Sequence, residues 1–271
     1  MNNDSKKLWI PKGDPKLLYD FLPGDTSRQT HALREALRAL DQLAPFDRAI
    51  TLLDLGCGAG SSYDAFCTSE RAIRWIGLDI LDSQEVILRP KRNLPFCAYN
   101  GVQVPLADQS VDIVYSRQVF EHVRHPKVLI EEIHRVLKKD GFFVGSTSHL
   151  EPFHSRSYWN YTPYGFCELL RDAGFRSILV RPGIDSLTLI GRRWLHYLRL
   201  DALFEPFFTV ESPANLFLEA ALRVLRQPTE RRNAFKLLFA GQFCFFARKH
   251  SDHELVVHKP EGATMLGSES R

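Results

Sequence analysis

The chain has 271 residues, of which 44% are hydrophobic, and a formal net charge of +3 at neutral pH. This length allows one substantial core with an appendage but is too short for two large independent domains. Lysine and arginine are scattered among acidic neighbours, whereas a specialised nucleic-acid binder is more strongly basic. We therefore expect one main globular domain without a dedicated nucleic-acid surface.

Five cysteines lie mostly in apolar surroundings and none forms a CxxC spacing. This usage predicts reduced thiols in a cytoplasmic protein. The first seven residues lack the apolar core of a signal peptide. The longest apolar run, 237–247, is too short for a membrane span and contains a glutamine, so it predicts a buried strand and no transmembrane segment.

In chain order, the first predicted element is a helix that Thr26 or Ser27 can cap and Pro45 ends, with an inward face made of Leu33, Leu37, Leu40 and Ala44. Strands are predicted near 49–55, 74–79, 94–99, 111–116, 142–147, 176–181 and 242–248. Helices are predicted between them, including 127–138 and one that Pro163 starts and Gly174 stops. This alternation predicts an α/β fold with a mostly parallel sheet.

The first predicted strand ends in Asp54 and continues into three alternating glycines, Gly56, Gly58 and Gly60. Glycine lets the backbone adopt left-handed angles and lets a ligand approach the chain closely, so a nucleotide cradle is expected. A dinucleotide fingerprint would have its third glycine where Ser61 stands. The Asp54 carboxylate would also repel a pyrophosphate, whereas an amino group and a sulfonium would be attracted. The pattern therefore favours S-adenosylmethionine over NAD.

The second predicted strand ends in Asp79 and Ile80. In doubly wound sheets, the acid that closes this strand accepts hydrogen bonds from the ribose hydroxyls, because two acceptor oxygens match two adjacent donors. A solvated turn aspartate is the alternative interpretation.

Three further segments carry a family resemblance: 100–116, Glu121-His122 and 135–141. They resemble the class I S-adenosylmethionine-dependent methyltransferases, in particular the small-molecule family of the ubiquinone-pathway type. In that family a Phe-Asp-like pair stands where Val111-Asp112 lies, and Arg-Val-Leu-Lys-Pro-Gly-Gly is similar to 135–141. The resemblance implies a Rossmann-like seven-stranded sheet, mostly parallel with an antiparallel last strand, and S-adenosylmethionine as the cofactor.

The resemblance also implies roles for single residues. The three glycines would line the methionine portion and Asp79 would bind the ribose. Asn100 stands where the family usually has aspartate and would accept from the adenine amine through its carbonyl oxygen. The residues expected at the cofactor are Asp54, Gly56, Gly58, Gly60, Asp79, Ile80, Asn100, Gly101, Ser116 and Arg117.

The residues that bind the methyl acceptor and take its proton are expected after the fourth and fifth strands, since ligands of open α/β sheets bind beyond the carboxyl ends of the strands. His122 and His154 are the candidate general bases, because imidazole titrates near neutrality. A capping or packing role for His122 is the alternative. Tyr158 and Trp159 are expected to contact a small-molecule acceptor.

A metal site is not expected in this loop. His149, Glu151 and His154 have the residue types of metal ligands, but their spacing fits no zinc signature.

Residues 184–240 interrupt the alternation and predict a helical insertion between the sixth and seventh strands. The insertion carries too many apolar side chains for an exposed helix. Burial against the main domain, a lid over an apolar acceptor site, a dimer face, and a peripheral membrane contact through 186–208 aided by Arg192, Arg193 and Arg199 are the alternatives. We expect a lid.

The predicted organisation is an N-terminal segment and helix (1–45), a methyltransferase core (46–183), the insertion (184–240), a final core strand (241–250) and a disordered tail (251–271). The predicted function is methyl transfer to a small-molecule oxygen, nitrogen or carbon nucleophile. The alternatives are a non-catalytic binding protein of the same fold and a nucleic-acid or protein methyltransferase. The segment 116–119 lacks the Pro-Pro-aromatic motif typical of nucleobase amino-methyltransferases.

Overall fold

The computed structural model describes residues 15–25, 32–43, 48–68, 71–90, 93–208 and 211–250. They form a seven-stranded sheet in the order β3-β2-β1-β4-β5-β7-β6. The strands are β1 (Ile50–Leu55), β2 (Ile73–Asp79), β3 (Phe96–Ala98), β4 (Val111–Arg117), β5 (Leu137–Ser148), β6 (Arg176–Pro182) and β7 (Gln242–Arg248). β1 to β5 run parallel to their neighbours in this group, and β7 is antiparallel to β5 and β6. The predicted fold class, with its antiparallel last strand, is confirmed.

Two strands differ in length from their predictions. β3 is only three residues long and pairs with β2 through Gly77, Leu78 and Asp79. β5 begins five residues early, because Leu137 already pairs with Val111 before a register shift in β4. Asp140, just after this start, takes a left-handed backbone conformation with φ of 62°.

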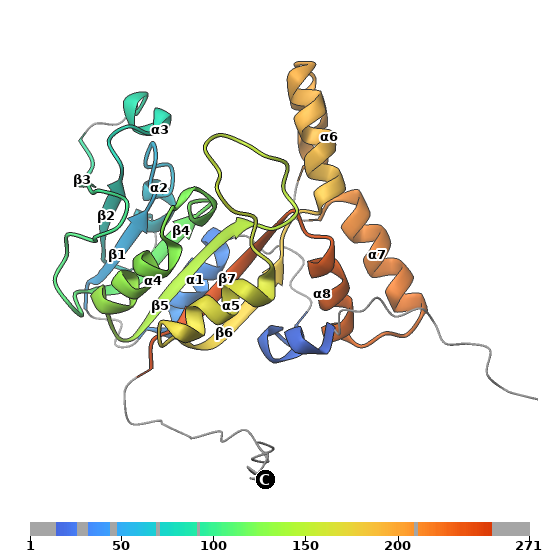
Figure 1. Ribbon diagram of the computed structural model, residues 1–271, viewed down its shortest axis with the longest axis horizontal. Helices are drawn as coiled ribbons and strands as arrows, with labels where there is room; N and C mark the ends of the chain where they lie inside the picture. Colours follow the sequence, from blue (N-terminus) through green and yellow to red (C-terminus); the bar gives the residue numbers. More distant parts are fainter. Residues whose placement is uncertain are drawn as a thin grey trace, which may run out of the picture.

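Helices cover both faces of the sheet (Figure 1). The elements before the insertion are η1 (Pro15–Phe21), α1 (Ala32–Gln42), α2 (Tyr63–Cys67), α3 (Gln84–Ile87), η2 (Phe120–His122), α4 (Pro126–Val136) and α5 (Pro163–Asp172). α1 and α2 share one apolar core with Ile50 and Leu52, whereas α4 and α5 share the other with Leu53 and Leu55. β1 supplies both cores because its side chains alternate between the faces of the sheet.

The first long helix buries Leu40 as predicted, but the rest of its buried face differs from the prediction. Ala36 and Ala39 are completely buried, while Leu33 and Leu37 lie at the margin of the contact. Alanine allows α1 to approach the sheet closely, which places the larger Leu33 and Leu37 beside the contact. The predicted cap at Thr26 or Ser27 and the end at Pro45 fall outside the described residues.

The predicted insertion is helical and consists of α6 (Ser186–Tyr197), η3 (Asp201–Phe207), α7 (Pro213–Val224) and α8 (Thr229–Leu238). α8 belongs to the core, because Ala234 and Leu237 are completely buried. α6 and α7 instead extend away from the sheet on the side of β6 and β7 (Figure 1). Burial against the main domain is therefore wrong for most apolar residues of 186–208. The predicted tail at 251–271 falls outside the described residues.

Candidate active site

The loop after β1 has a backbone conformation that favours glycine. Gly56, Gly58 and Gly60 have φ angles of +69°, +50° and +76°. A Cβ atom on Gly56 would lie 2.2 Å from the Val119 side chain, and one on Gly60 would lie 2.9 Å from the Phe96 ring. Side chains at these positions would therefore be both strained and obstructed. The bare loop predicted from the sequence is present at the carboxyl edge of the sheet.

Asp54 closes β1 as a buried carboxyl group, 3% exposed. The hydroxyl of Ser62 donates to its Oδ2 atom and accepts from the Trp75 indole N–H at 3.3 Å. Burial raises the pKa of Asp54 to about 7, although Ser62 and Trp75 oppose this shift. A cation beside this carboxyl would favour its ionised form.

Asp79 ties the glycine loop to the end of β2. Its Oδ2 accepts from the Gly58 N–H at 2.7 Å, and its Oδ1 accepts from the Ile80 N–H at 2.7 Å. Burial raises the pKa of this carboxyl, and the two N–H groups partly offset the rise. Each oxygen keeps acceptor capacity for a second donor such as a ribose hydroxyl.

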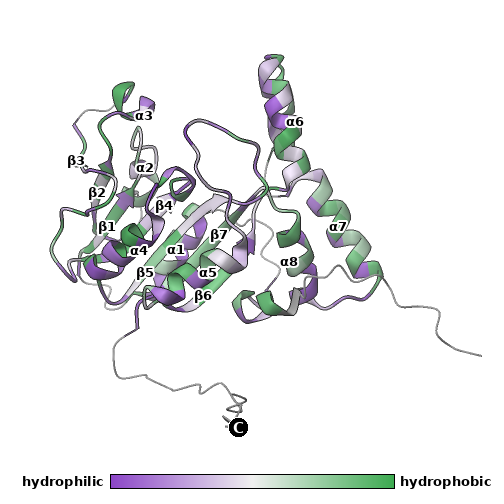
Figure 2. Cartoon of the chain, viewed as in Figure 1, coloured by the Kyte–Doolittle hydropathy of each residue, from purple (hydrophilic) through white to green (hydrophobic). Residues whose placement is uncertain are grey.

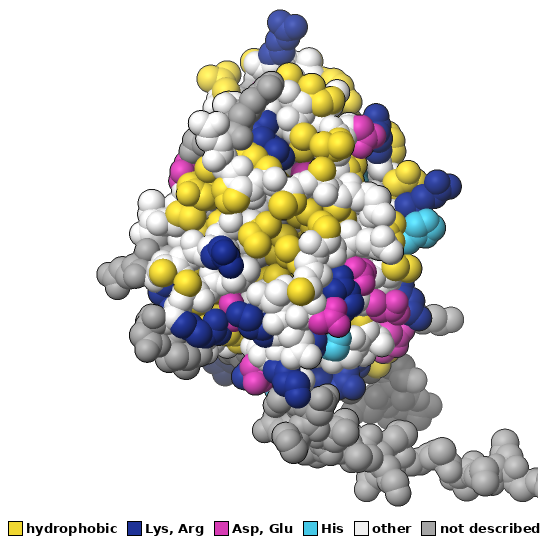
Figure 3. Space-filling model, turned by 90° about the vertical axis from the view of Figure 1, so that its left-hand side faces the viewer, with side chains coloured by type: hydrophobic (Ala, Val, Ile, Leu, Met, Phe, Trp, Pro, Cys, Tyr) yellow, Lys and Arg dark blue, Asp and Glu magenta, His cyan; other side chains and the backbone are white. Residues whose placement is uncertain are grey.

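A second support of the loop is Arg89, beyond α3, which no sequence motif indicated. Its Nε atom donates to the Gly58 carbonyl at 2.9 Å, and its guanidinium lies 3.4 Å from the centre of the Phe96 ring. Seen from the β2–β3 side, the molecule gathers apolar side chains on this face (Figure 3). In and around α3, the side chains of Leu81, Ile87 and Leu88 are exposed.

Asn100 uses its carbonyl oxygen within its own loop. The Oδ1 atom accepts from the N–H groups of Val102 at 3.0 Å and Gln103 at 2.8 Å. The amide NH₂ group, rather than this oxygen, is then the part of Asn100 that can meet a ligand. Gly101, with φ of +80°, lies against Ile80, so Ile80, Asn100 and Gly101, all expected at the cofactor, are close in space.

Ser116 and Arg117 end β4 beside β1, since Ser116 pairs with Leu55. Ser116 is completely buried, and its hydroxyl has no hydrogen-bond partner among the described residues. Arg117 is exposed and electrostatically favours the ionised form of Asp54. Gln118 follows with φ of +54° and turns the chain towards η2.

The structure brings the two candidate bases together. The rings of His122 and His154 meet edge to face, with centroids 5.2 Å apart. The Nδ1 atom of His122 is buried without a partner among the described residues. Burial and the neighbouring His154 lower the pKa of His122, which favours a neutral imidazole at physiological pH. The Nδ1 atom of His154 faces the Pro152 carbonyl at 3.3 Å.

The loop after β5 is clamped onto η2, which explains how these distant histidines meet. The Glu121 carbonyl accepts from the N–H groups of Tyr158 at 2.6 Å and Trp159 at 3.2 Å. The Trp159 indole donates to the Val123 carbonyl at 2.8 Å, and the Tyr161 hydroxyl donates to the Phe120 carbonyl at 3.1 Å. Tyr158 and Trp159 keep their side chains largely exposed, at 56% and 45%.

Two buried acids underlie this loop. Burial raises the pKa of Glu121 to about 7, and its carboxyl accepts from the Thr147 hydroxyl at 3.0 Å. Glu151 accepts from Ser148 at 2.7 Å and Gln242 at 2.8 Å. Its Oε1 atom also pairs with Arg193 of α6 at 3.2 Å. The insertion is thereby joined to the loop that carries His154.

Glu121, His122 and His154 each present one potential metal-ligand atom, and these atoms lie within 4.8 Å of one another. This set differs from the one considered in the sequence, because His149 hydrogen-bonds to the Tyr161 carbonyl instead. The absence of a metal at this site stays a prediction.

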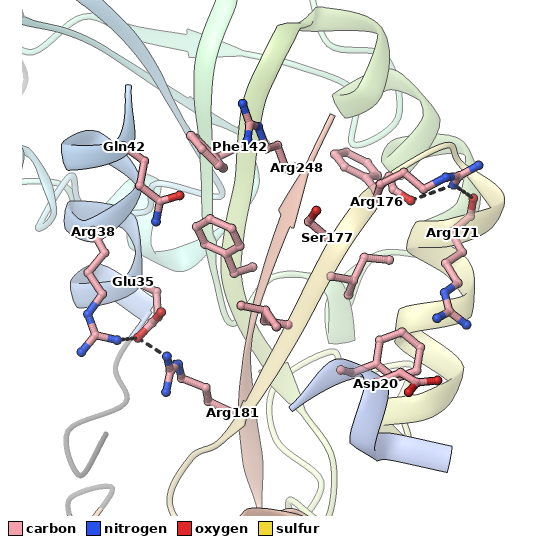
Figure 4. A pocket seen from close by; sticks show the side chains of 15 residues that line it. Asp20, Glu35, Arg38, Gln42, Phe142, Arg171, Arg176, Ser177, Arg181 and Arg248 are labelled. Atoms are coloured by element: carbon pink, nitrogen blue, oxygen red, sulfur yellow. Dashed lines mark hydrogen bonds and ion pairs between the residues drawn. The ribbon is translucent and has the colours of Figure 1, made fainter. Parts of the chain in front are cut away.

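A separate pocket lies between α1 and β6, away from the glycine loop (Figure 4). Arg38 and Arg181 reach Glu35 there, with N–O distances of 2.6 Å and 3.3 Å. None of the described residues that line this pocket was predicted to bind cofactor or acceptor. We therefore place the candidate active site at the carboxyl edge of the sheet.

Residues 53–145 match the methyltransferase domain family. The match begins in β1 and ends in β5, so it contains the glycine loop, both carboxylates and η2. A probable S-adenosylmethionine-dependent methyltransferase of Mycolicibacterium smegmatis is 33% identical over 136 residues, which are 46% of this chain and 51% of that protein. Another, from Mycobacterium tuberculosis, is 30% identical over 145 residues, with 49% and 52% covered. The chain spans about half the length of these curated relatives.

Two solved structures establish the same Rossmann-like methyltransferase fold. A phosphoethanolamine N-methyltransferase of Haemonchus contortus, in complex with S-adenosylmethionine, matches with a TM-score of 0.51 and 18% identity, covering 80% of this chain and 53% of its own. An S-adenosylmethionine-dependent methyltransferase from Archaeoglobus fulgidus matches with a TM-score of 0.51 and 15% identity, covering 80% and 92%.

Proposed function

We propose that this protein is an S-adenosylmethionine-dependent methyltransferase that acts on a small-molecule acceptor. One observation carries the proposal: three glycines with positive φ stand between the carboxyl groups of Asp54 and Asp79, inside the segment that matches the methyltransferase domain family. The relatives named as probable S-adenosylmethionine-dependent methyltransferases support the same cofactor.

The residues fit this cofactor in shape and charge. The glycine loop offers close approach to the backbone, and the buried Asp54 offers a negative charge to an ammonium or sulfonium group. Asp79 retains lone pairs for the ribose, and the unpaired Ser116 hydroxyl is a buried polar group at the same edge.

Methyl transfer to a hydroxyl or amine requires that the acceptor atom is aligned with the methyl group and that a base accepts the released proton. When bound, S-adenosylmethionine supplies a methyl carbon whose bond to sulfur breaks as the acceptor atom bonds to it, with the electron pair remaining on sulfur. For a hydroxyl or amine acceptor, one imidazole takes the released proton. His154 suits this role at Nε2, because its Nδ1 atom faces the Pro152 carbonyl. His122 is kept neutral beside it and has an unpaired Nδ1 atom.

We also propose that α6 forms a lid over the acceptor. The Arg193–Glu151 ion pair joins α6 to the loop that carries His154, Tyr158 and Trp159. The same proposal includes an apolar acceptor and a cytoplasmic location, as the sequence led us to expect.

The proposal is tested by incubating the purified protein with methyl-labelled S-adenosylmethionine and a cell extract, and then identifying the labelled metabolite. His122→Ala and His154→Ala should each lower turnover while calorimetry gives unchanged cofactor affinity. His125→Ala, an exposed histidine on the same segment, is the matched control. Full activity of both test variants would remove the base assignment. Absence of heat with S-adenosylmethionine, together with saturable NADH binding, would overturn the proposed function.

A further inference from the structure

α6 carries an apolar stripe that faces away from the domain. Leu187, Ile190, Trp194, Tyr197 and Leu198 are between 41% and 84% exposed. With 3.6 residues per turn, these positions share one face roughly 120° wide. Among the residues of α6, all of which the structure describes, only Leu189 is fully buried, and it points to the opposite side. The amphipathic pattern is therefore turned outward.

η3 and α7 also expose apolar side chains. In α7, Phe217 and Val224 are 75% and 82% exposed, while Glu219 and Leu222 lie on the buried side. The hydropathy colouring shows the apolar stretches along α6 and α7, which project from the sheet (Figure 2). The apolar side chains that define the outer face are Leu187, Ile190, Trp194, Tyr197, Leu198, Leu203, Phe204, Phe207, Leu216, Phe217 and Val224.

Exposed basic residues lie on the same helical segment as this outer face. From 186 to 239 the sequence has eight Lys or Arg residues against five Asp or Glu residues, an excess equal to the formal charge of the whole chain. Arg192 and Arg199 are exposed on α6 and just after it, and Arg223 and Arg226 are exposed at the end of α7. A surface of this charge is attracted to anionic groups.

The composition of the outer face is typical of protein surfaces that contact lipid headgroups. Large contiguous apolar patches on soluble proteins mark interaction sites. Tryptophan and tyrosine on an outward apolar helix face, with arginines on the polar side of the same helix, match the boundary between lipid headgroups and acyl chains. Within the described part of the chain, no helix is long and apolar enough to cross a bilayer. We propose that the outer face of α6, η3 and α7 docks on the surface of a membrane that contains anionic lipid.

Docking would also orient the active site. The inner side of α6 holds Glu151 through Arg193, so a bilayer on its outer side would lie next to the acceptor loop. The substrate class that this arrangement favours is an amphiphilic acceptor that resides in the bilayer. This consequence rests on the proposed function, whereas the docking itself does not.

The test is flotation of the full chain with phosphatidylcholine vesicles, with and without phosphatidylglycerol. We expect binding to the anionic vesicles, weaker binding at high salt, and a blue shift of tryptophan emission. Leu187→Glu combined with Trp194→Glu should reduce bound protein by about tenfold. Arg192→Gln combined with Arg199→Gln should reduce the preference for anionic vesicles.

Leu88→Glu is the matched control, because Leu88 is an equally exposed apolar residue (78%) on α3's side of the molecule. It should float like the wild type. Failure of the wild-type protein to float with anionic vesicles, or equal loss in the Leu88→Glu control, would overturn the proposal. Light scattering tests whether a second copy of the chain occupies the outer face instead of a membrane. If the wild-type protein is a dimer that Trp194→Glu dissociates, and if it does not bind vesicles, the outer face belongs to that second copy. Vesicle binding without methyl transfer would leave the docking in place and refute the proposed function.

Discussion

At the scale of single residues, Asp54 is a carboxyl group whose charge depends on what lies beside it. Burial raises its pKa to about 7, while Ser62, Trp75 and the more distant Arg117 favour the ionised form. A ligand that carries an ammonium or sulfonium group gains most from the ionised carboxylate. Cofactor binding and ionisation of Asp54 should therefore be linked.

This linkage predicts a pH dependence of cofactor affinity. The free protein holds Asp54 mainly protonated below pH 7, so binding a cation there must first release the proton. Affinity for S-adenosylmethionine should rise by about tenfold between pH 6 and pH 8 and then level off. Calorimetry across this range measures the slope. Asp54→Asn should bind weakly with a flat profile, whereas Asp64→Asn, on exposed α2 surface, should keep the slope. A slope that persists in Asp54→Asn would assign the linkage to another group.

A second prediction for a single residue concerns the effect of Gly58→Ala on stability and cofactor affinity. Its φ of +50° is unfavourable for alanine, and the added Cβ would lie 3.2 Å from Glu85 Cβ. Gly58→Ala should lower the free energy of unfolding by about 1–2 kcal/mol and weaken cofactor binding by about tenfold or more. Chemical denaturation and calorimetry measure the two effects. Gly191→Ala is the control, since that glycine is helical with open space around it and should gain up to about 1 kcal/mol. Equal affinity in both variants would argue against close approach of the cofactor to the loop.

At the scale of elements, the site is a contact between segments that are distant in sequence. η2 supplies His122, the loop after β5 supplies His154, and backbone hydrogen bonds from Tyr158 and Trp159 to Glu121 hold the two segments together. α6 joins the same loop from outside through Arg193. The geometry of the proposed acceptor site therefore depends on how three elements pack.

The α6 connection predicts an effect on acceptor binding alone. Arg193→Met keeps the apolar stem but leaves the buried Glu151 without its cation, so the loop should be held less firmly. The KM for the acceptor should rise by about three- to tenfold, a loss of roughly 1 kcal/mol, with unchanged affinity for S-adenosylmethionine. Steady-state kinetics and calorimetry separate these quantities. Arg192→Met, which replaces an exposed side chain of α6, should leave both the KM for the acceptor and the cofactor affinity unchanged. An equal rise in KM for both variants would contradict the lid.

At the scale of the whole molecule, one sheet supports two apolar cores and a projecting helical arm. α8 completes one core through Ala234 and Leu237, although it lies in the segment grouped with the insertion from sequence. Removing the entire insertion should therefore unfold the protein as well as remove the proposed lid. Substitutions on α6 and α7 avoid this problem because those helices lie outside both cores.

Cofactor binding should stabilise the whole molecule. The glycine loop bridges β1 and β2, so a ligand bound there favours the folded state by about 2.7 kcal/mol at a concentration 100 times its Kd. For a chain of this size the Tm should rise by roughly 5–10 °C. Thermal unfolding with S-adenosylmethionine, and with NADH as the control, measures the shift. A comparable rise with NADH alone would point to a dinucleotide site.

Local sequence patterns are enough to predict the sheet and the glycine loop. The alternation of strands and helices predicts the α/β class, and local spacing places Gly56, Gly58 and Gly60 directly after Asp54. These features are readable because each depends on neighbours within a few residues: a buried strand needs an apolar run, and a left-handed turn favours glycine.

The contacts between distant residues and the exposure of each helix face follow from three-dimensional packing. The His122–His154 contact and the Arg193–Glu151 pair join segments separated by 32 and 42 residues in the chain, and no local pattern specifies such pairings. The apolar content of 186–208 predicted helices but not the direction of their apolar face. Amphipathic periodicity is the same whether a stripe faces a core or faces outward, so packing alone settled that α6 turns its stripe away from the domain.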